Sequence, residues 1–458
     1  MLEIKFIREN AALIKKIAKE KRVICDIDKL LKLDERRREH LHKLEKLKAA
    51  HNADSKGRKG KPSHEEIVGM RERAEEIKIA EEGQRAFEEE YDLEMAQVPN
   101  IVHESVPHGK DESENVVVRK VGKPPKFAFA PKEHWELGTA LGVIDTERAS
   151  HVSGARFAYL KGKLALLQFA LINFAMSVAT NEKTLAAIAK KAKLKVSVKP
   201  FTPVIPPVLM RPDVMQKMAR LEPREERYHI TGDDLYLVGS AEHTLGPLHM
   251  GETLDEAALP IRYIGYSTAF RREAGSYGKD TKGMIRVHQF DKVEFESFTT
   301  AEQGIVEQDF LIAIQEYLMQ QLGIPYQVVF KCTGDMGAPD FREYDIEAWM
   351  PGQGKYRETH TSDYMTDFQA RRLNTRYKTA GTPPLTPPRQ GGEIGQQFPP
   401  LPEGRLGGVG AKFVHMNDAT ALAMSRIPVA IMENYQQPDG SIKIPEVLVP
   451  FCGFDVIK

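Results

Sequence analysis

Residues 27 to 91 contain two helical segments with one short break between them, and this pattern restricts the fold more than any other feature. In both segments apolar residues recur at steps of three and four, which is the spacing of a coiled-coil seam. They are Ile27, Leu30, Leu31, Leu41, Leu44 and Leu47 in the first segment, and Ile67, Met70, Ala74, Ile77, Ala80, Phe87 and Tyr91 in the second. The break, HNADSKGRKGKPS, is polar and contains glycine and proline, as at the tip of a hairpin. The sequence therefore predicts a long antiparallel helical hairpin.

The two segments of this hairpin differ in charge. Basic residues gather in the first segment and the break: Arg36, Arg37, Arg38, Lys43, Lys46, Lys48, Lys56, Arg58, Lys59 and Lys61. The second segment is acidic from Glu65 to Glu90. Antiparallel pairing would bring opposite charges together and leave a surplus of positive charge near the tip. Two interpretations remain open: a solvated hairpin stabilised by its own ion pairs, or a lever that presents cations to a phosphate backbone.

With 458 residues the chain is too long for one compact core, so we expect two or three domains. A polar connection that contains several prolines follows the hairpin, and we place the boundary near Pro99, which gives domains 1–99 and 100–458. Candidate strands follow at close spacing: FTPVIPPVLM, DDLYLVG, IRYIGYSTAF, MIRVHQFDKVEFESF, PYQVVFKC and EYDIEAWM. Strands without regular intervening helices predict an α+β fold, with a mainly antiparallel sheet and helices packed on it.

Composition restricts the class of partner and the cell compartment. Lys+Arg and Asp+Glu both total 65, so any nucleic-acid surface has to be a local patch. The three cysteines, Cys25, Cys332 and Cys452, form no CxxC pair, which argues against a disulfide framework and a zinc knuckle and suits a cytoplasmic protein. The N-terminus shows no secretory or transit signal. The uncharged stretch from Leu164 to Asn181 contains recurrent polar residues, so we expect a buried core helix there and not a membrane span.

The stretch TAFRREAGSYGKDTKG, between two candidate strands, is the strongest candidate for a ligand site. It carries Arg271, Arg272, Glu273, Lys279 and Lys282. An arginine at the end of a strand offers a planar fork that matches a phosphate and stays charged at any working pH. The chain has neither a strand-GxGxxG-helix nor a GxxxxGK[ST] pattern, so a bound nucleotide would need another device. Taken alone, the stretch is equally compatible with a basic surface hairpin.

Several motifs in one order resemble a known family. Phe270-Arg271-x-Glu273, then VHQFDKVEF, and finally ALAMSRIPVAIMENYQQPDGSIKIPEVLVPF resemble motifs 2 and 3 of class II aminoacyl-tRNA synthetases, and specifically those of the seryl-tRNA synthetase family. The resemblance covers nearly the whole chain, since it includes MLEIKFIREN, the helical hairpin, HWELGTALGVID, TGDMG, YDIEAW and TDFQARR. It implies a class II catalytic domain that follows a tRNA-binding arm.

For the nucleotide, the resemblance implies ATP as substrate with Mg²⁺. Arg271 would bind the α-phosphate, and Glu273 would accept a hydrogen bond from the adenine amino group. Phe290 and the main chain near Val287 would pack against the adenine, and Arg426 would cover its other face and reach the γ-phosphate. The remaining ATP contacts implied are Glu358, which would bind the Mg²⁺ ion, together with Arg272, Thr359, His360 and Thr361. Arg271, Arg426 and Glu358 would then be the catalytic residues.

For the amino acid, the resemblance implies a serine pocket made of Ser240, Ala241, Glu242, Arg271, Glu294 and Thr420. Carboxylates suit an α-ammonium group, and a small hydroxyl group can recognise the serine side chain. The implied reaction forms seryl-adenylate and then transfers the seryl group to the 3′ end of tRNA(Ser), with tRNA(Sec) left open as a second substrate. The resemblance further implies a homodimer, with Pro206 or Pro207 at the subunit interface.

Two other functions remain to be distinguished from this one: a class II relative that loads an amino acid onto a carrier protein, and a noncatalytic RNA-binding coiled-coil protein. The chain also departs from the family pattern. Ser240 replaces the usual threonine, His360 lies within the Glu358 stretch, and Pro428 falls inside the helix predicted near the C-terminus. The alignment of Asn417 and Asp418 is ambiguous, and the segment from Gly381 to Gly410 is rich in proline and glycine.

Overall fold

The computed structural model describes residues 1–56, 63–274, 282–379 and 410–458. The predicted hairpin tip from 57, the loop positions around Lys279 and nearly all of the proline- and glycine-rich segment lie outside these ranges. The described chain divides into two compact units, Met1–Ile101 and Val102–Lys458. Each unit has its own hydrophobic clusters.

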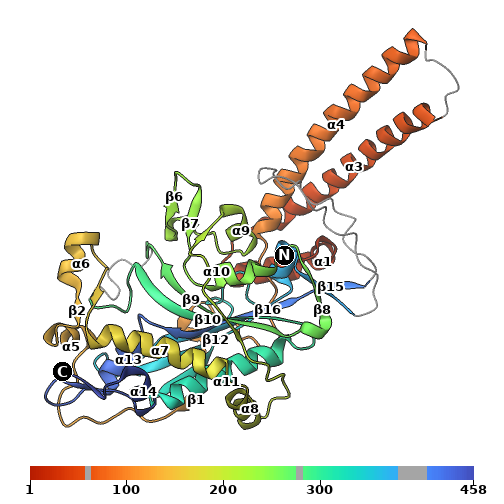
Figure 1. Ribbon diagram of the computed structural model, residues 1–458. Coiled ribbons are helices and arrows are strands. Elements are labelled where there is room, and N and C mark those ends of the chain that lie inside the picture. The colour runs from red at the N-terminus through yellow and green to blue at the C-terminus, as the bar shows by residue number, and fades with distance from the viewer. Residues whose placement is uncertain (57–62, 275–281, 380–409) are drawn as a thin grey trace. The chain divides into compact units, whose positions relative to one another are not determined.

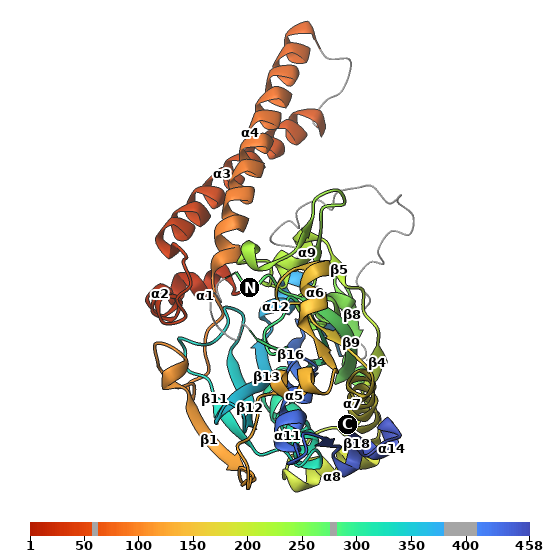
Figure 2. The same cartoon turned by 90° about the vertical axis from the view of Figure 1, so that its left-hand side faces the viewer.

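The first unit consists of α1 (Ile4–Glu9), α2 (Ala11–Glu20), α3 (Ile27–Lys56) and α4 (His64–Gln97). Helices α3 and α4 are the long antiparallel pair seen side by side in Figures 1 and 2, as the apolar spacing predicts. Their inner ends pack on the two short helices through a cluster that includes Ile7, Ile14, Leu30 and Tyr91. Helix α3 continues through the first six residues of the predicted break, because HNADSK contains no proline or glycine to stop it.

The seam of this helical pair is only partly apolar. Leu44 is buried as expected, whereas Ala74, which the spacing places on the seam, is exposed. Polar residues occupy other seam positions: Asp34, Arg37 and Gln84 are at most 5% exposed. Asp34 forms ion pairs with Arg8 of α1 at 3.2 Å, with Arg38 at 3.1 Å and with Arg37 at 3.5 Å. Further out, Lys48 and Glu81 form a cross-helix pair at 2.7 Å, one of the ion pairs that the charge pattern predicts.

The second unit is built on an eight-stranded sheet in the order β1-β11-β12-β13-β16-β10-β9-β4. The strands are β1 (Val116–Val121), β4 (Thr202–Val204), β9 (Ile261–Phe270), β10 (Gln289–Thr299), β11 (Tyr326–Phe330), β12 (Arg342–Met350), β13 (Lys355–Thr366) and β16 (His415–Ala423). All neighbours are antiparallel except β4 and β9, which are parallel. The α+β architecture with a mainly antiparallel sheet is therefore confirmed.

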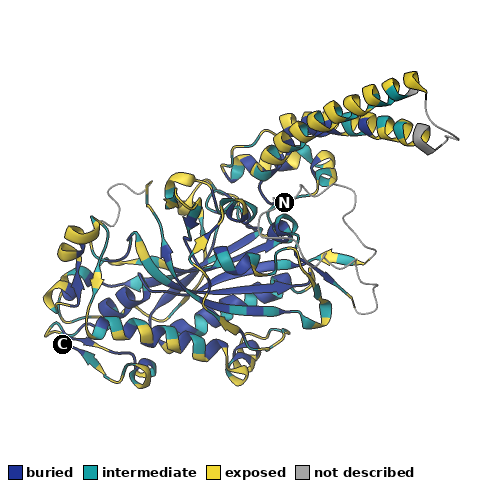
Figure 3. Cartoon of the chain, turned by 45° about the horizontal axis from the view of Figure 1, so that its top comes forward, coloured by how far each residue is buried: buried dark blue, intermediate teal, exposed yellow. Residues whose placement is uncertain are grey.

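Two helices, α7 (Lys163–Ala179) and α11 (Gly304–Gln321), pack on one face of this sheet (Figure 1). Strand alternation directs Phe295 and Ala419 into the large core beneath them, where both are buried. Most of the central sheet is coloured as buried in Figure 3. Helix α7 is thus the core helix expected from the uncharged stretch. No single helix in the described ranges could cross a bilayer; only α7 and α8 (Glu182–Lys191) together, bent by 76°, reach the length and composition of a span.

Shorter elements surround the sheet. They are β2 (Ile144–Asp145), β3 (Tyr159–Leu160), β5 (Leu209–Met210), β6 (His229–Ile230), β7 (Leu235–Leu237), β8 (Thr253–Asp255), β14 (Arg376–Lys378), β15 (Ala411–Phe413), β17 (Ile442–Lys443), β18 (Val456–Ile457), α5 (His134–Ala140), α6 (Thr146–Ser153), α8 (Glu182–Lys191), α9 (Pro212–Lys217), α10 (Glu242–Leu245), α12 (Phe368–Leu373), α13 (Ile427–Asn434) and α14 (Val449–Cys452). A second apolar cluster, which includes Met215, Met218 and Phe298, packs on the sheet face that carries Glu294.

Pro428 does not interrupt a helix, contrary to the expectation from the sequence. The stretch Ala421–Ala423 is the end of β16, and α13 begins only at Ile427, so Pro428 occupies the first helical turn. The first four N–H groups of a helix have no intrahelical partner, and a proline therefore loses no hydrogen bond there. No kink is needed.

Candidate active site

The predicted site residues come from six separate segments that meet on the sheet face opposite α7 and α11. Glu294 lies on β10, Glu358 on β13 and Thr420 on β16, while Arg271 directly follows β9. Arg426 is the N-cap residue of α13, and Ser240 and Ala241 lead into α10, which begins at Glu242. Because Glu294 pairs in register with Thr420, both side chains emerge on the same face.

Glu294 is the centre of the predicted serine pocket. Its Oε1 accepts hydrogen bonds from Ser240 Oγ at 3.1 Å and from Thr420 Oγ1 at 3.2 Å. It also forms an ion pair with Lys292, which the sequence analysis did not single out. Glu294 is fully buried, and its Oε2 has no hydrogen-bond partner in the described protein. Burial raises the pKa of Glu294 against the effect of Lys292. The predicted pocket therefore contains two hydroxyl groups and one carboxylate oxygen, Glu294 Oε2, that can accept a further hydrogen bond.

Glu242 closes the same pocket from the side of α10. Its Oε2 lies 3.2 Å from Ser240 Oγ, whose single hydrogen can be donated either to Glu242 or to Glu294, and its Oε1 lies 3.1 Å from Arg220 Nε. Burial alone would raise the pKa of this carboxyl group, but Arg220 and other basic side chains nearby outweigh burial and lower the pKa to about 2. Glu242 is thus an ionised carboxylate beside the hydroxyl of Ser240. The serine residue at position 240 keeps the hydroxyl contacts that the usual threonine would make.

Arg271 occupies the predicted phosphate position with a fixed side chain. Its Nε donates to Gly239 O at 3.0 Å, and its guanidinium lies 5.4 Å from the ring centroid of Phe290. Val287 is 5% exposed and belongs to the core. Arg272 lies 6.0 Å from the ring of Tyr228, and Glu273 forms an ion pair with Arg286. Glu273 has a φ of 53°, which is uncommon for a residue with a side chain and marks the sharp exit from β9.

Glu358 and Arg426 form the second charged pair of the cleft. Arg426 Nη1 lies 2.8 Å from Glu358 Oε1 and donates to the Glu358 carbonyl oxygen, also at 2.8 Å. The Glu358 side chain is 46% exposed. Desolvation would raise its pKa, but Arg426, Lys331, Arg271 and Lys292 lower it to about 2, so the carboxylate is ionised. An exposed, ionised oxygen ligand suits Mg²⁺.

The residues that follow Glu358 differ in exposure. Thr359 and His360 are each 1% exposed, whereas Thr361 is half-buried. The Oγ1 of Thr359 and the Nδ1 of His360 are 2.8 Å apart. Burial lowers the pKa of His360 to about 3, which leaves the imidazole neutral at physiological pH. The structure therefore does not support a pH-sensitive contact by His360.

A row of four carboxylates crosses the sheet beside the serine pocket, and the sequence analysis did not find it. Glu296 pairs in register with Asp418, Asp418 with Asp363, and Asp363 with Glu343, so one face of four adjacent strands carries them. We call these residues the carboxylate row. All four are buried, and burial raises their pKa, to about 7 for Glu343. The pairing also shows that Asp418 shares the face of Thr420, whereas Asn417 lies on the other face.

Three buried carboxylates at this place, Asp340, Glu343 and Asp363, have oxygen atoms within 4.8 Å of one another. That spacing alone would allow a metal ion. However, Glu343 already accepts from Gly337 N at 3.2 Å and forms an ion pair with Lys331 at 2.8 Å. The charge of the cluster is thus compensated in part by the protein itself.

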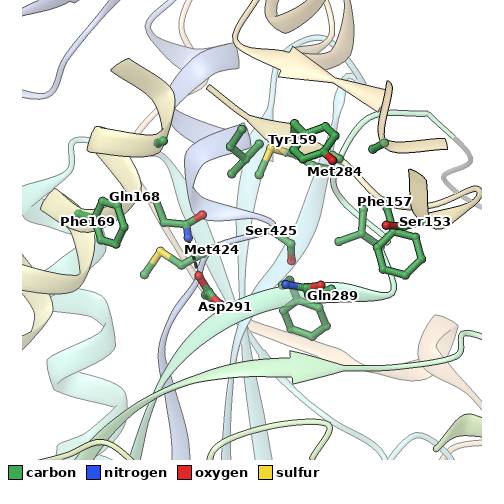
Figure 4. A pocket seen from close by; sticks show the side chains of 16 residues that line it. Ser153, Phe157, Tyr159, Gln168, Phe169, Met284, Gln289, Asp291, Met424 and Ser425 are labelled. Carbon is green, nitrogen blue, oxygen red and sulfur yellow. Dashed lines mark hydrogen bonds between the residues drawn. The ribbon is translucent and has the colours of Figure 1, made fainter. Parts of the chain in front are cut away.

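A cavity of about 350 Å³ lies near the strand end that carries Phe290. Figure 4 shows Gln168 of α7 and Asp291 of β10 pointing toward one another across it, with Met424 and Ser425 close by. Asp291 Oδ2 accepts from Gln168 Nε2 at 2.6 Å and from Tyr266 Oη at 3.0 Å. Phe290 and Val287 line the cavity, but Ser240, Arg271 and Glu358 do not. The predicted phosphate and serine contacts therefore lie outside it.

Comparison with known proteins supports the class of enzyme that these features indicate. Residues 226–386 match the sequence model of the tRNA synthetase class II core domain (G, H, P, S and T). A prolyl-tRNA synthetase from Giardia lamblia in complex with prolyl-adenylate, only 12% identical, shares the fold with a TM-score of 0.52 over 70% of this chain and 58% of that one. The fold and the core domain together define a class II aminoacyl-tRNA synthetase.

The arm and the full-length matches specify the family. Residues 1–102 match the seryl-tRNA synthetase N-terminal domain. Serine–tRNA ligases from Thermotoga neapolitana and Thermodesulfovibrio yellowstonii are 41% and 38% identical, each over 100% of both chains. The structure of seryl-tRNA synthetase from Pyrococcus horikoshii complexed with ATP has a TM-score of 0.82 at 36% identity, over 100% of this chain and 99% of that one. The chain belongs to the seryl-tRNA synthetase family, and its activity is serine–tRNA ligation. The carrier-protein and noncatalytic alternatives are therefore not supported.

Proposed function

We propose that this chain activates serine with ATP at the site formed by Arg271, Arg426 and Glu294, and then transfers the seryl group from the adenylate to the 3′-terminal adenosine of tRNA(Ser), with release of AMP. The observation that carries the proposal is the Glu294 carboxylate, which receives both the Ser240 and the Thr420 hydroxyl groups. Such a buried hydroxyl-lined pocket favours a small substrate with a hydroxyl group, because an analogue without one would leave polar groups unpaired.

In the first step the carboxylate of serine attacks the α-phosphate of ATP, the bond from the α-phosphorus to the bridging oxygen breaks, and seryl-adenylate and pyrophosphate are formed. Arg271 is fixed by Gly239 and Phe290, so its positive charge is in place before the extra negative charge develops on the phosphate. Arg426 stabilises the distal phosphates, and Glu242 binds the α-ammonium group. Glu358, with Thr361 nearby, would bind a Mg²⁺ ion, which neutralises phosphate charge when present. Apart from this, positioning and charge stabilisation suffice, and no side-chain nucleophile takes part.

In the second step the seryl group passes to tRNA that the arm formed by α3 and α4 binds. The support for this role is the length of the pair and the basic residues of α3, since RNA helices are recognised largely by shape and backbone. We further propose a homodimer with Pro206 or Pro207 at the interface. Its support is the exposure of large apolar side chains on the second unit, namely Ile205 at 87%, Phe169 at 58% and Leu166 at 52%. The three free cysteines suit the cytoplasm.

Pyrophosphate exchange measured with each of the twenty amino acids tests the first step. We expect exchange to depend on serine, with at most weak signals from other small amino acids. Exchange that depends on another amino acid, or none at all in folded enzyme, would contradict the proposal.

Shortening the arm tests the division of labour between the two units. Lys48 and Glu81 lie opposite each other, so residues 49–80 can be replaced by a short Gly/Ser turn that keeps the cluster around Leu30 and Tyr91. We expect tRNA charging to be lost while serine-dependent exchange persists. Equal loss of both activities in a folded variant would contradict a tRNA-binding role for the arm.

A further inference from the structure

Arg220 lies between the predicted ammonium-binding carboxylate and the carboxylate row. It follows α9 in a turn in which Ala219 has a φ of 57°, and its backbone N–H donates to Met215 O at 3.1 Å. The side chain is 15% exposed. Nε lies 3.1 Å from Glu242 Oε1, while Nη2 lies 3.4 Å from Asp418 and 3.8 Å from Asp363. One guanidinium group thus contacts carboxylates from α10, β16 and β13.

The contacts of Glu242 show what this arrangement does. One oxygen of Glu242 lies 3.1 Å from Arg220 Nε, and the other lies 3.2 Å from Ser240 Oγ, so a neighbour on each side limits how the carboxylate can turn. An ionised carboxylate has about four lone-pair sites, and these two contacts leave acceptor capacity for an ammonium group. Without a cation beside it, a carboxyl group this deeply buried would favour its neutral form, which binds an ammonium group poorly.

The carboxylate row holds Arg220 from the side opposite Glu242. Asp418 accepts a hydrogen bond from Arg220 Nη2 at 3.4 Å, Asp363 lies 3.8 Å from the same nitrogen, and Asp340 lies 4.0 Å from it. The other basic groups that act on Glu242 include His243, Lys292, Arg271 and Arg227, and the carboxyl groups of Glu294, Glu296 and Asp418 act on it as well. His243 is buried, and its pKa is lowered well below the usual range by burial, so it adds no full charge at neutral pH.

We propose that Arg220 is a positioning residue for serine binding: anchored by Asp418 and Asp363, it orients the Glu242 carboxylate toward the α-ammonium group of the amino acid. This inference rests on the proposed function, because it takes Glu242 as the ammonium ligand. Arg220 itself touches neither the serine nor the nucleotide. Its effect should therefore appear in the binding of serine and not in that of ATP.

The direct test compares Arg220→Met and Arg220→Lys with the wild-type enzyme in serine-dependent pyrophosphate exchange. For Arg220→Met we expect the KM for serine to rise about 10- to 100-fold while the KM for ATP changes less than about twofold. Arg220→Lys retains the charge but has no planar fork that reaches both Glu242 and Asp418, so it should restore only part of the serine affinity. A serine KM within about twofold of wild type for both variants would overturn the proposal.

Arg342→Met serves as the matched control. Arg342 is similarly buried, with its side chain 9% exposed, and it bonds to Gln308 and Asp309 of α11 on the other side of the sheet. We expect this variant to lower stability and leave the serine KM unchanged. If Arg342→Met raises the serine KM as much as Arg220→Met does, the effect is a general result of removing a buried arginine, and the proposal fails.

A double-mutant cycle with Glu242→Gln separates this inference from the proposed function. If Arg220 acts through Glu242, the effects of the two substitutions on serine KM should be strongly non-additive. Additive effects would refute the positioning role while leaving the serine site intact. A normal serine KM for Glu242→Gln alone would instead refute the assignment of Glu242, and with it the proposed serine pocket. Should Arg220→Met not fold, the same cycle is measured with Arg220→Lys.

Discussion

The most direct test of the chemistry is replacement of Arg271 by alanine. Because Nε of Arg271 already donates to Gly239 O, the terminal nitrogens form the fork that would reach the α-phosphate. A charge-assisted hydrogen bond contributes about 1.5–3 kcal/mol, and removal of one preorganised donor from an active site typically costs about 3–4 kcal/mol of transition-state stabilisation. Serine-dependent exchange at saturating substrates should therefore fall about 10²- to 10³-fold.

Arg271→Lys is the informative companion. Lysine retains a positive charge, but it cannot keep both the bond to Gly239 O and a planar fork on the phosphate, so we expect a loss of about tenfold or more. Circular dichroism and thermal unfolding of both variants would establish that the fold is retained. Exchange by folded Arg271→Ala within about threefold of wild type would refute the role that we assign to this residue.

Three further predictions concern stability. His360→Asn should reduce the pH dependence of unfolding: the pKa of His360 is about 3 in the folded protein and near 6.5 when unfolded, so its contribution is present above pH 6.5 and lost as pH falls below it. Urea unfolding at pH 8 and pH 5 should show a smaller loss in the variant, and identical losses would contradict the assignment. Gly334→Ala should lower the free energy of unfolding by about 1–3 kcal/mol, because the new Cβ would lie 2.2 Å from Lys110 O, whereas Gly232→Ala, with open space around it, should change it by less than about 1 kcal/mol. Pro428→Ala should cost less than about 1 kcal/mol; a gain of about 3 kcal/mol would mean that the proline strains the helix after all.

The strongly periodic parts of the fold could be predicted from the sequence. The helical hairpin follows from three- and four-residue apolar steps, and β9 from the run IRYIGYSTAF. Strand β13 escaped prediction because KYRETHTSDYMT has polar residues at most positions, and its central place in the sheet depends on pairing with two neighbours. The first five residues of MIRVHQFDKVEFESF are not part of the strand, since apolar residues such as Met284 and Ile285 pack in the core without ladder pairing.

The candidate site residues also fall into two groups: those that local motifs could identify and those that they could not. Arg271, Glu358 and Arg426 could be named from motifs because each lies in a distinctive local context. Lys292, Arg220 and the carboxylate row could not, since their meaning depends on strand register. The alternation of polar and apolar residues in FDKVEFESF favours a solvent-facing position for Glu296. In the structure, however, Glu296 is fully buried opposite Asp418. Local patterns do not reveal which distant carboxylates will share one arginine.

The polar residues inside the helical pair have a consequence for the length of the arm. If α4 slipped against α3 by one helical turn, its far end would move by about 5.4 Å, and His40 would lose Gln84, now 3.2 Å away. The same slip would separate Lys29 from Glu94, at 2.6 Å, and move Tyr91 from beneath Arg37. An all-leucine seam would tolerate such sliding much better, because its contacts repeat at every heptad. The polar contacts thus fix one register of α3 against α4. The distance from the inner ends of the two helices to their outer ends is therefore constant, and a molecule bound at the outer end would be held at that distance.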